Sequence, residues 1–459
     1  MVVPYLHKRT INTDMQAIDK KILHLALPSI VQNITVPLLG LVDLTIVGHF
    51  GSAQAIAAIA VGSMIFNVLY WLLGFLRMGT SGLTAQGWGR EDWDDVRRLL
   101  RRALLLGLGL GLALIALQIP LGWTALTVIH PSDSVRPLAH LYFSVCIWGA
   151  PAVLALYSLN GWFIGTQDTR TPLYVAIAQN IINIIASLVF VYLLRMNIAG
   201  VALGTLVAQW SGFALSVTMA HRKSTMLRKK SEMQHDVETS PAEAAGQPAG
   251  SPTPWSKFFT VNRDIFLRTV FLVAVSLFFT SVGAREGDVI LSVNTVLFTF
   301  YTLVSYVLDG FAFAGEAVCG STWGSGDTKA FRLSVSRLFH WGWIMTILFT
   351  IIYAVGGLPF THLLTDEPNV RTALLPYFPW VILVPIMGMA AFVYDGVMIG
   401  ITATRGMLVS SCLATVIFFV LFFGLYALGL PTNHVLWGAF IVYLLARGVI
   451  QWRWMKRLY

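Results

Sequence analysis

Charged residues are scarce in this sequence. Asp, Glu, Lys and Arg make up 12% of the 459 residues, about half of their share in an average soluble domain. Hydrophobic residues make up 56%, and the mean hydropathy is +0.71. This balance excludes an ordinary soluble fold and favours a chain that crosses a membrane many times.

Cysteine and catalytic motifs are also scarce. The three cysteines, Cys146, Cys319 and Cys412, lie inside apolar runs, and such an odd, scattered set forms neither a disulfide framework nor a metal site. No phosphate-binding pattern G-x-x-x-x-G-K-[ST] occurs, and no cluster of His and acids or nucleophile motif marks an enzyme. We therefore expect no enzymatic activity and no cofactor, and transport driven by an ion gradient or by the substrate's own gradient.

Apolar runs dominate what is present. A membrane span needs about 20 mostly apolar residues, and twelve runs meet this length. We expect an all-α polytopic membrane protein, with spans at 24–47, 53–78, 99–121, 137–158, 172–194, 198–220, 264–284, 288–318, 333–358, 372–399, 407–428 and 434–452.

The basic residues agree with this count. With the N-terminus inside, 26 of the 31 Lys and Arg residues, Arg268 and Arg447 among them, fall in the expected cytoplasmic segments. Arg77 lies within a helix, and the outside loops hold only Arg136, Arg195, Arg285 and Arg371. This positive-inside pattern predicts a multi-pass membrane protein with both termini in the cytoplasm. The basic residues then meet anionic lipid rather than nucleic acid.

The composition changes abruptly after the sixth run. Residues 222–262 are basic at first and then rich in Pro, Ala, Gly, Ser and Glu, a composition typical of disordered segments. We interpret them as a disordered cytoplasmic linker between an N-lobe, 1–221, and a C-lobe, 263–459.

The two halves carry related sequences. NGWFIGTQDTR at 160–170 matches DGVMIGITATR at 395–405 at an offset of 235, and Gly74 with Phe75 recurs as Gly310 with Phe311 at an offset of 236. Because each half has six spans, both cross the membrane in the same direction. The sequence therefore predicts a parallel repeat of two six-helix bundles around a central cavity, a layout found in secondary transporters.

The first expected span contains an acid. An ionised carboxylate such as Asp43 costs about 3 kcal/mol at the centre of a bilayer, so it normally faces a cavity and has a function. Pro28 and Pro37 each remove a backbone hydrogen bond and can bend the helix, and Asn33 lies on roughly the face of Asp43. We expect Asp43 to bind a proton or cation on a helix that bends.

Two further sets of polar residues lie inside expected spans. Asn180, Asn183 and Ser187 are spaced three and four apart, so they share a helix face that either completes a pocket around Asp43 or joins two helices by hydrogen bonds. In the second half, Asp309, Glu316 and Asp395, with Tyr394, are candidates for a negative substrate cavity attractive to organic cations.

These residues resemble a known family. PLLGLVDLTIVGHFG in the first span, DGFAFAGEAVCG at 309–320 and DGVMIGITATR at 395–405 are similar to the multidrug and toxic compound extrusion (MATE) transporters, in particular their DinF-like branch. The resemblance implies a cation-coupled antiporter that exports amphipathic, often cationic, compounds. It further implies that Asp43 is the main ion or proton site, that bending of the first helix involves Pro28, and that Asn183 belongs to the N-lobe pocket.

The sequence departs from the family pattern at two places. Ser187 stands where many relatives carry an acid, and the seventh span has no embedded acid, unlike the NorM-like branch. Both departures favour H⁺ over Na⁺ as the coupling ion, because Na⁺ needs several oxygen ligands whereas one carboxylate is enough for a proton.

A lipid-linked precursor or polysaccharide flippase of the same superfamily is the alternative function. A flippase that handles pyrophosphate groups needs several intramembrane Arg or Lys residues, and the expected topology leaves only Arg77. We therefore favour export of small organic molecules by a monomer in contact with membrane lipid.

Overall fold

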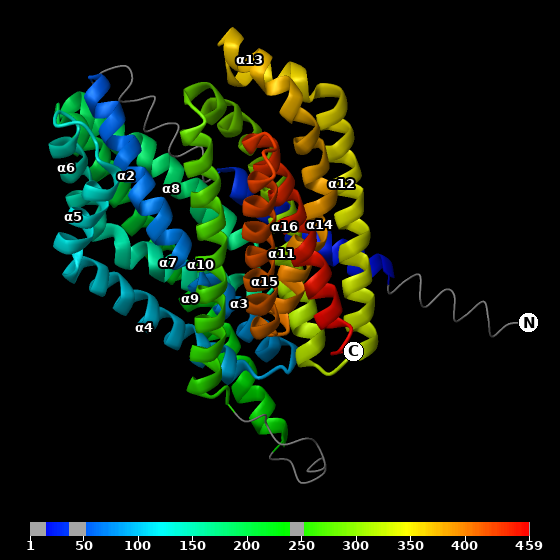
Figure 1. Ribbon diagram of the computed structural model, residues 1–459. Helices are drawn as coiled ribbons and strands as arrows, with labels where there is room; N and C mark the ends of the chain where they lie inside the picture. Colours follow the sequence, from blue (N-terminus) through cyan, green and yellow to red (C-terminus); the bar gives the residue numbers. More distant parts are fainter. Residues whose placement is uncertain (1–14, 36–51, 239–251, 459) are drawn as a thin grey trace, which may run out of the picture. The chain divides into compact units, whose positions relative to one another are not determined.

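The computed structural model describes residues 15–35, 52–238 and 252–458, which Figure 1 shows as ribbons. Every regular element in these ranges is a helix, so the expected all-α fold is confirmed. Eleven of the described helices are long and apolar enough to cross a membrane, and they correspond to the second to twelfth expected spans. The first expected span begins in a helix over 15–35 and continues into residues outside the described ranges.

The first half of the chain is divided more finely than the sequence predicts. The second expected span breaks after Leu72, and the fourth contains a short 3-10 turn, Ile147–Gly149. The π-helical turn Val189–Leu193 ends the fifth. The α-helices of this half are α2 (Ala53–Leu72), α3 (Phe75–Gly89), α4 (Trp93–Ala116), α5 (Gln118–Ile129), α6 (Arg136–Cys146), α7 (Ala150–Gly165), α8 (Arg170–Leu188) and α9 (Asn197–Glu238).

The second half contains longer, less interrupted helices. A tight turn separates the first two, and its Gly287 adopts a φ of 101°, a conformation that glycine accepts without steric cost. The α-helices of this half are α10 (Trp255–Arg285), α11 (Asp288–Gly324), α12 (Thr328–Leu364), α13 (Pro368–Leu374), α14 (Phe378–Gly400), α15 (Thr404–Ala427) and α16 (Thr432–Met455).

The chain divides into two compact units. We call Val31–Phe258 the N-terminal unit, and the described part of Met1–Ile30 together with Phe259–Tyr459 the C-terminal unit. The expected N-lobe started at residue 1, whereas here the first described helix contributes residues 15–30 to the C-terminal unit.

The sequence repeat corresponds to a repeated helix contact. In the N-terminal unit, a β-carbon on Gly161 of α7 would lie 2.2 Å from the carbonyl oxygen of Arg77 on α3. In the C-terminal unit, a β-carbon on Gly396 of α14 would lie 2.3 Å from the carbonyl oxygen of Ala312 on α11. Glycine therefore permits backbone-to-backbone approach in both units, as in other small-residue helix contacts.

The same contact extends one turn further in each unit. Four residues after each glycine, Gly165 packs against Ser81 and Thr84 of α3, and Gly400 packs against Glu316 and Gly320 of α11. Two glycines spaced four apart thus join corresponding helices in the two halves, which gives the sequence repeat a structural basis.

The expected disordered linker is partly helical. α9 continues to Glu238 and α10 begins at Trp255, so the interpretation of 222–262 as disordered is wrong for 222–238 and 255–262. The extension is rich in Lys, Arg, Glu, Met and Leu, which are strong helix formers. Arg228 and Glu232 also form an ion pair of 3.3 Å along it, which favours a helix at this spacing.

Segments assigned to the cytoplasm meet at one end of the N-terminal unit. Lys223 of α9 pairs with Asp168 before α8 at 3.3 Å, and Ser231 of α9 donates a 2.8 Å hydrogen bond to Asp94 at the start of α4. Three separate connections therefore lie on the same side, as the expected topology requires.

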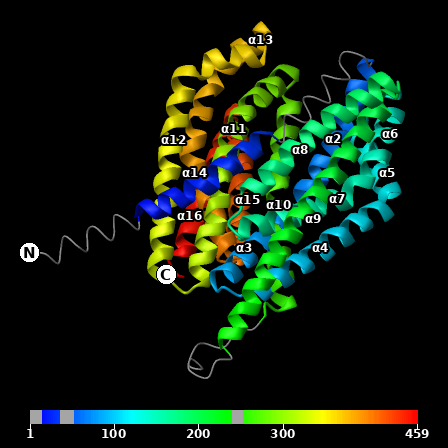
Figure 2. The same cartoon turned by 180° about the vertical axis from the view of Figure 1, so that it is seen from behind.

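The first described helix packs on the C-terminal unit through a charged anchor. Asp19 accepts two hydrogen bonds from the guanidinium of Arg337 on α12, at 2.7 and 2.5 Å, and a third from the indole of Trp341 at 3.0 Å. Eleven residues later, Ile30 packs against Gly310 of α11. Figure 2 shows this helix, in dark blue, crossing the C-terminal helices.

We predict that the Asp19 anchor weakens only in acid. Burial works to raise the pKa of Asp19, but the hydrogen bonds from Arg337 and Trp341 and the Arg337 charge outweigh burial and hold this pKa below its usual value. A depressed pKa stabilises the fold above the unfolded value of about 4, and the effect is lost as the pH falls through the folded value. At pH 7 we therefore expect Asp19→Asn to speed amide exchange over residues 15–22 by about 10-fold, the loss of a charged hydrogen bond.

Exposed Glu286 supplies the control for this experiment. Glu286→Gln should leave exchange over residues 15–22 unchanged, and the difference between the parent and Asp19→Asn should shrink as the pH falls below about 4, after correction for intrinsic exchange rates. A parent that already exchanges as fast as Asp19→Asn at pH 7 would contradict the anchor.

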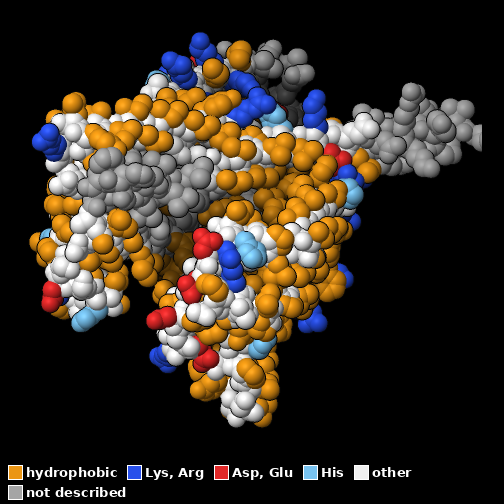
Figure 3. Space-filling view, turned by 90° about the horizontal axis from the view of Figure 1, so that it is seen from above, with side chains coloured by type: hydrophobic (Ala, Val, Ile, Leu, Met, Phe, Trp, Pro, Cys, Tyr) orange, Lys and Arg blue, Asp and Glu red, His pale blue; other side chains and the backbone are white. Residues whose placement is uncertain are grey.

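Much of the surface is apolar. Figure 3 shows hydrophobic side chains over most of one face, with charged side chains gathered in a few places. Ile119, Val355 and Leu363 are each about 80% exposed, which suits helices that face lipid rather than water.

Candidate functional site

The first helix is described only in part. Asp43 and Pro37 lie outside the described residues, whereas Pro28 and Asn33 lie in the helix over 15–35, which remains helical through Pro28. The roles predicted for Asp43 and for bending at either proline remain predictions.

The polar face of α8 contacts two different neighbours in the N-terminal unit. The Asn180 side chain donates a 3.1 Å hydrogen bond to the carbonyl of Thr35, at the end of the first described helix. The Asn183 side chain donates at 3.1 Å to the hydroxyl of Thr205 on α9. Ser187 packs against Gly204 of α9, where an added β-carbon would lie 2.2 Å from its hydroxyl. The face therefore joins the first helix to α8 and α8 to α9.

This face also retains unused polar atoms. Asn183 and Ser187 are fully buried, and the Asn183 carbonyl oxygen and the Ser187 hydroxyl have no hydrogen-bond partner among the described residues. Buried polar atoms without a partner are uncommon in proteins. These two atoms are thus available to a group or ion that the described residues do not supply.

Asp395 lies at the centre of a buried ionic cluster in the C-terminal unit. One of its oxygens accepts hydrogen bonds from the guanidiniums of Arg268 on α10 and of Arg447 on α16, the latter at 2.7 Å. Its other oxygen accepts a 2.6 Å bond from the Gln451 side chain on α16. Each of these residues is at most 7% exposed. The cluster joins three helices, and we call it the Asp395 cluster.

The Asp395 cluster corrects two expectations. Arg268 and Arg447 are buried and paired with Asp395, so their assignment to cytoplasmic segments is wrong. Asp395 is bonded to two cations, so it does not add a free negative charge to a cavity for organic cations. The argument against a flippase also loses its premise, because Arg77 is not the only arginine within the expected spans.

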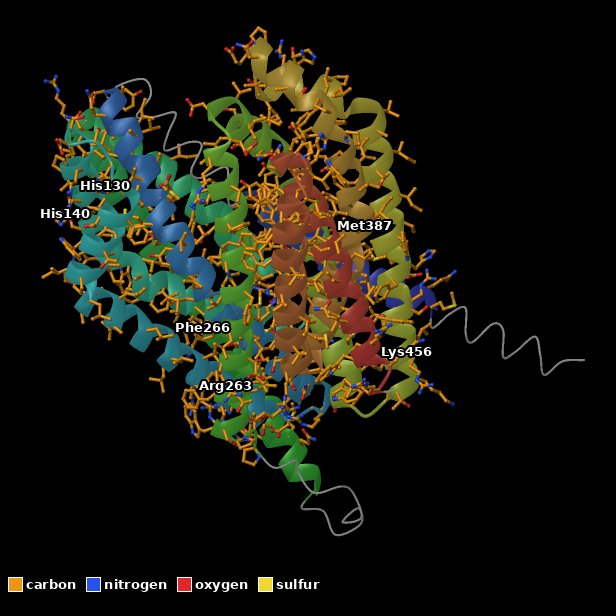
Figure 4. The ribbon with its side chains drawn as sticks, in the orientation of Figure 1. His130, His140, Arg263, Phe266, Met387 and Lys456 are labelled. Carbon is orange, nitrogen blue, oxygen red and sulfur yellow. The ribbon has the colours of Figure 1, made fainter. Side chains whose placement is uncertain are left out.

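A signal for this cluster is present in the sequence. Arg268 lies inside the expected span 264–284 and Arg447 inside 434–452. A charge within a span is costly unless it has a partner, so two such arginines require an acid on a neighbouring helix. Figure 4 labels Arg263 on α10, five residues before Arg268, and Lys456 directly after α16, nine residues after Arg447.

The other C-lobe candidates have different surroundings. Glu316 is 1% exposed within α11, where the backbone of α14 approaches it at Gly400. Tyr394 is buried, with its ring 4.6 Å from that of Phe339. Asp309 is half-buried within α11.

No metal centre is found in the described ranges. Within 15–35, 52–238 and 252–458, no three His, Cys, Asp or Glu side chains are grouped so as to hold a metal ion.

Comparisons with known proteins agree with this architecture. The family model described as MatE matches residues 28–189 and 265–423, once in each half of the chain. DNA damage-inducible protein F of Escherichia coli is 34% identical over 435 residues, which cover 94% of this chain and 90% of that protein. Multidrug resistance protein MdtK of Edwardsiella ictaluri is 24% identical, over 95% of this chain and 96% of that protein.

Solved structures show the same fold. A crystal structure of MATE in the bent conformation superimposes with a TM-score of 0.81, covering 97% of both chains at 16% identity. At this identity the likeness concerns the fold alone.

Proposed function

Because the chain belongs to the MatE family, whose members are transporters rather than enzymes, we propose that it is an H⁺-coupled antiporter. It exports amphipathic or cationic organic compounds by alternating access, with Asp43 as the proton site. The name of the Edwardsiella relative, a multidrug resistance protein, supports this class of substrate. We further propose an inner-membrane monomer with both termini in the cytoplasm, in accord with the placement of basic residues.

The observation that carries the proposal is the α8 face. Asn180 holds this face against Thr35, eight residues before Asp43 in the sequence, and Asn183 and Ser187 offer buried, unpartnered oxygens. A proton needs one basic oxygen, which the Asp43 carboxylate supplies, and we propose that the neutral oxygens of Asn183 and Ser187 accept a hydrogen bond from its protonated form. Taking up a proton removes the cost of a charge in the membrane, which couples protonation to a change of conformation.

Transport by purified protein in liposomes tests this proposal. With an imposed pH gradient and no Na⁺, the parent should move a fluorescent organic cation in one direction and protons in the other. The luminal pH should therefore change in step with movement of the cation. Asp43→Asn should bind the cation but lose gradient-driven transport by at least about 100-fold, because its side chain no longer exchanges a proton.

Two outcomes bear on the alternatives. If Asp43→Asn transports as well as the parent, the proposal is contradicted. If the parent transports only when Na⁺ is present, the coupling ion is Na⁺ rather than H⁺. Exposed Asp133 supplies the control, since Asp133→Asn lies in a loop of the same unit and should transport normally.

A flippase for lipid-linked precursors is the second candidate function. The buried Arg268 and Arg447 favour it, because guanidinium groups bind phosphate well. Asp395 opposes it, since it already pairs with both arginines. Movement of a fluorescent lipid pyrophosphate between leaflets by the same liposomes, without movement of the organic cation, would favour the flippase.

A further inference from the structure

The Asp395 cluster has more positive than negative charge. Among the described residues, Arg268 and Arg447 form ion pairs with Asp395 alone, so two guanidiniums share one carboxylate. The fourth member, Gln451, is neutral and fully buried. An uncompensated charge in a buried site is costly, and an anion placed beside the arginines would compensate it.

The arginines also have hydrogen-bonding capacity to spare. Each guanidinium carries five N–H donors, and each bonds to Asp395 through a single terminal nitrogen. In the described part of the chain, the buried Nε atoms of Arg268 and Arg447 have no hydrogen-bond partner. Two buried N–H donors, one on each of two helices, are therefore available to one acceptor group.

Aromatic rings lie beside these donors. Arg447 lies over the ring of Tyr443, 5.7 Å from its centre, and the Tyr443 ring is 6.1 Å from Phe440. Phe440 contacts Tyr301 at 5.3 Å, and Tyr301 contacts Phe298 at 4.9 Å. This aromatic ladder of Tyr443, Phe440, Tyr301 and Phe298 joins α16 to α11. A charged end followed by flat apolar rings suits an amphipathic molecule.

We propose that the Asp395 cluster binds the anionic group of amphipathic substrates, with the apolar body against the aromatic ladder. The inference rests on the proposed function, since it adds zwitterions and anions to the substrates of that transporter. The group pairs with the free edges of Arg268 and Arg447, and Asp395 acts as the internal anion that occupies the arginines between substrates. A carboxylate is the best match, because guanidinium binds it through two parallel hydrogen bonds.

Two dyes that differ by one methyl group test the proposal. Rhodamine 110 has a free carboxylate, and rhodamine 123 is its methyl ester, so only the first presents an anion. Binding to protein in nanodiscs is measured by fluorescence polarisation without any ion gradient. Arg447→Gln should weaken binding of the acid by at least about 10-fold, the loss of a charged hydrogen bond, and change binding of the ester by less than about twofold.

The opposite substitution strengthens the test. Asp395→Asn removes the internal anion that competes for both arginines, so we expect tighter binding of rhodamine 110, by on the order of 10-fold, and unchanged binding of the ester. A purely structural cluster cannot produce tighter binding of one dye alone. Arg453→Gln is the matched control, because Arg453 lies exposed on the same helix, α16, and should affect neither dye.

Each outcome decides the proposal. Arg447→Gln leaves Asp395 with Arg268 and Gln451, so the variant should fold, and if it does not, Asp395→Asn decides alone. Equal effects on the two dyes, or no binding of the acid by the parent, would overturn the site. If the arginines bind farnesyl pyrophosphate but not rhodamine 110, they would be assigned to a lipid phosphate instead. Failure of the H⁺ antiport proposal shows only in liposomes, so the two failures are distinguishable.

Discussion

Gly396→Ala is expected to destabilise the protein by about 3 kcal/mol or more, at the upper end of the cost of overpacking. The added β-carbon would lie 2.3 Å from the carbonyl oxygen and 2.6 Å from the Cα of Ala312. Both are backbone atoms, so no side-chain rotation relieves the clash and α14 must move away from α11. Because Asp395 immediately precedes Gly396, the shift would also disturb its hydrogen bonds to Arg268 and Arg447.

Thermal unfolding in detergent measures this effect, with Gly424→Ala as the matched control. Gly424 lies within α15, and a β-carbon there would meet nothing within 4 Å in the described structure. Alanine should stabilise that helix by up to about 1 kcal/mol. Equal unfolding temperatures of Gly396→Ala and Gly424→Ala would contradict the close contact. By the repeat, Gly161→Ala and open Gly109→Ala should differ in the same way.

The spans and the repeat could be predicted because each depends on local sequence. Apolar length alone identified eleven described helices, and the matched glycines at 161 and 396 follow from the need of two backbones for close approach. The sequence did not predict which residues these glycines contact. The structure shows that they are Arg77 in one unit and Ala312 in the other.

The Asp395 cluster was missed because charges were counted by segment. Counting Lys and Arg by segment treats an arginine near the end of a span as a loop residue, and Arg268 and Arg447 both lie near span ends. Their partner, Asp395, is more than 50 residues away from Arg447 and more than 120 from Arg268. No local pattern encodes such a pairing, although the cost of a lone charge in a span would have required one.

The extension of α9 was missed for a different reason. Composition was averaged over residues 222–262, although the Pro, Gly and Ala residues are concentrated after residue 240. The first part satisfies helix propensity, and its Lys223 and Ser231 gain partners on neighbouring connections. A composition average therefore hides a helix wherever two unlike segments adjoin.

The return of the chain to α10 depends on one buried carboxylate of the N-terminal unit. Asp95, on α4, is fully buried and accepts hydrogen bonds from the backbone N–H of Thr253 at 3.1 Å and from its hydroxyl at 2.6 Å. The same carboxylate pairs with Arg90 at 3.3 Å and with Arg98 at 3.7 Å. Arg102 adds a hydrogen bond to the Thr253 carbonyl and lies over the ring of Trp255. Asp95 thus fixes the segment that leads into α10.

We expect Asp95→Ala to destabilise the N-terminal unit by on the order of 3 kcal/mol, since removing one partner of a buried ion pair leaves the others unsatisfied. Arg90 and Arg98 remain partly in contact with water, 32% and 41% exposed, which keeps the cost at the lower end of that range. Asp95→Asn should have a smaller effect, because the amide oxygen still accepts from Thr253. Trypsin cleavage after Lys257 should become about 10-fold faster in Asp95→Ala, while exposed Asp133→Ala should match the parent. Cleavage at the parent's rate in Asp95→Ala would mean that Arg102 and Trp255 hold the segment without the carboxylate.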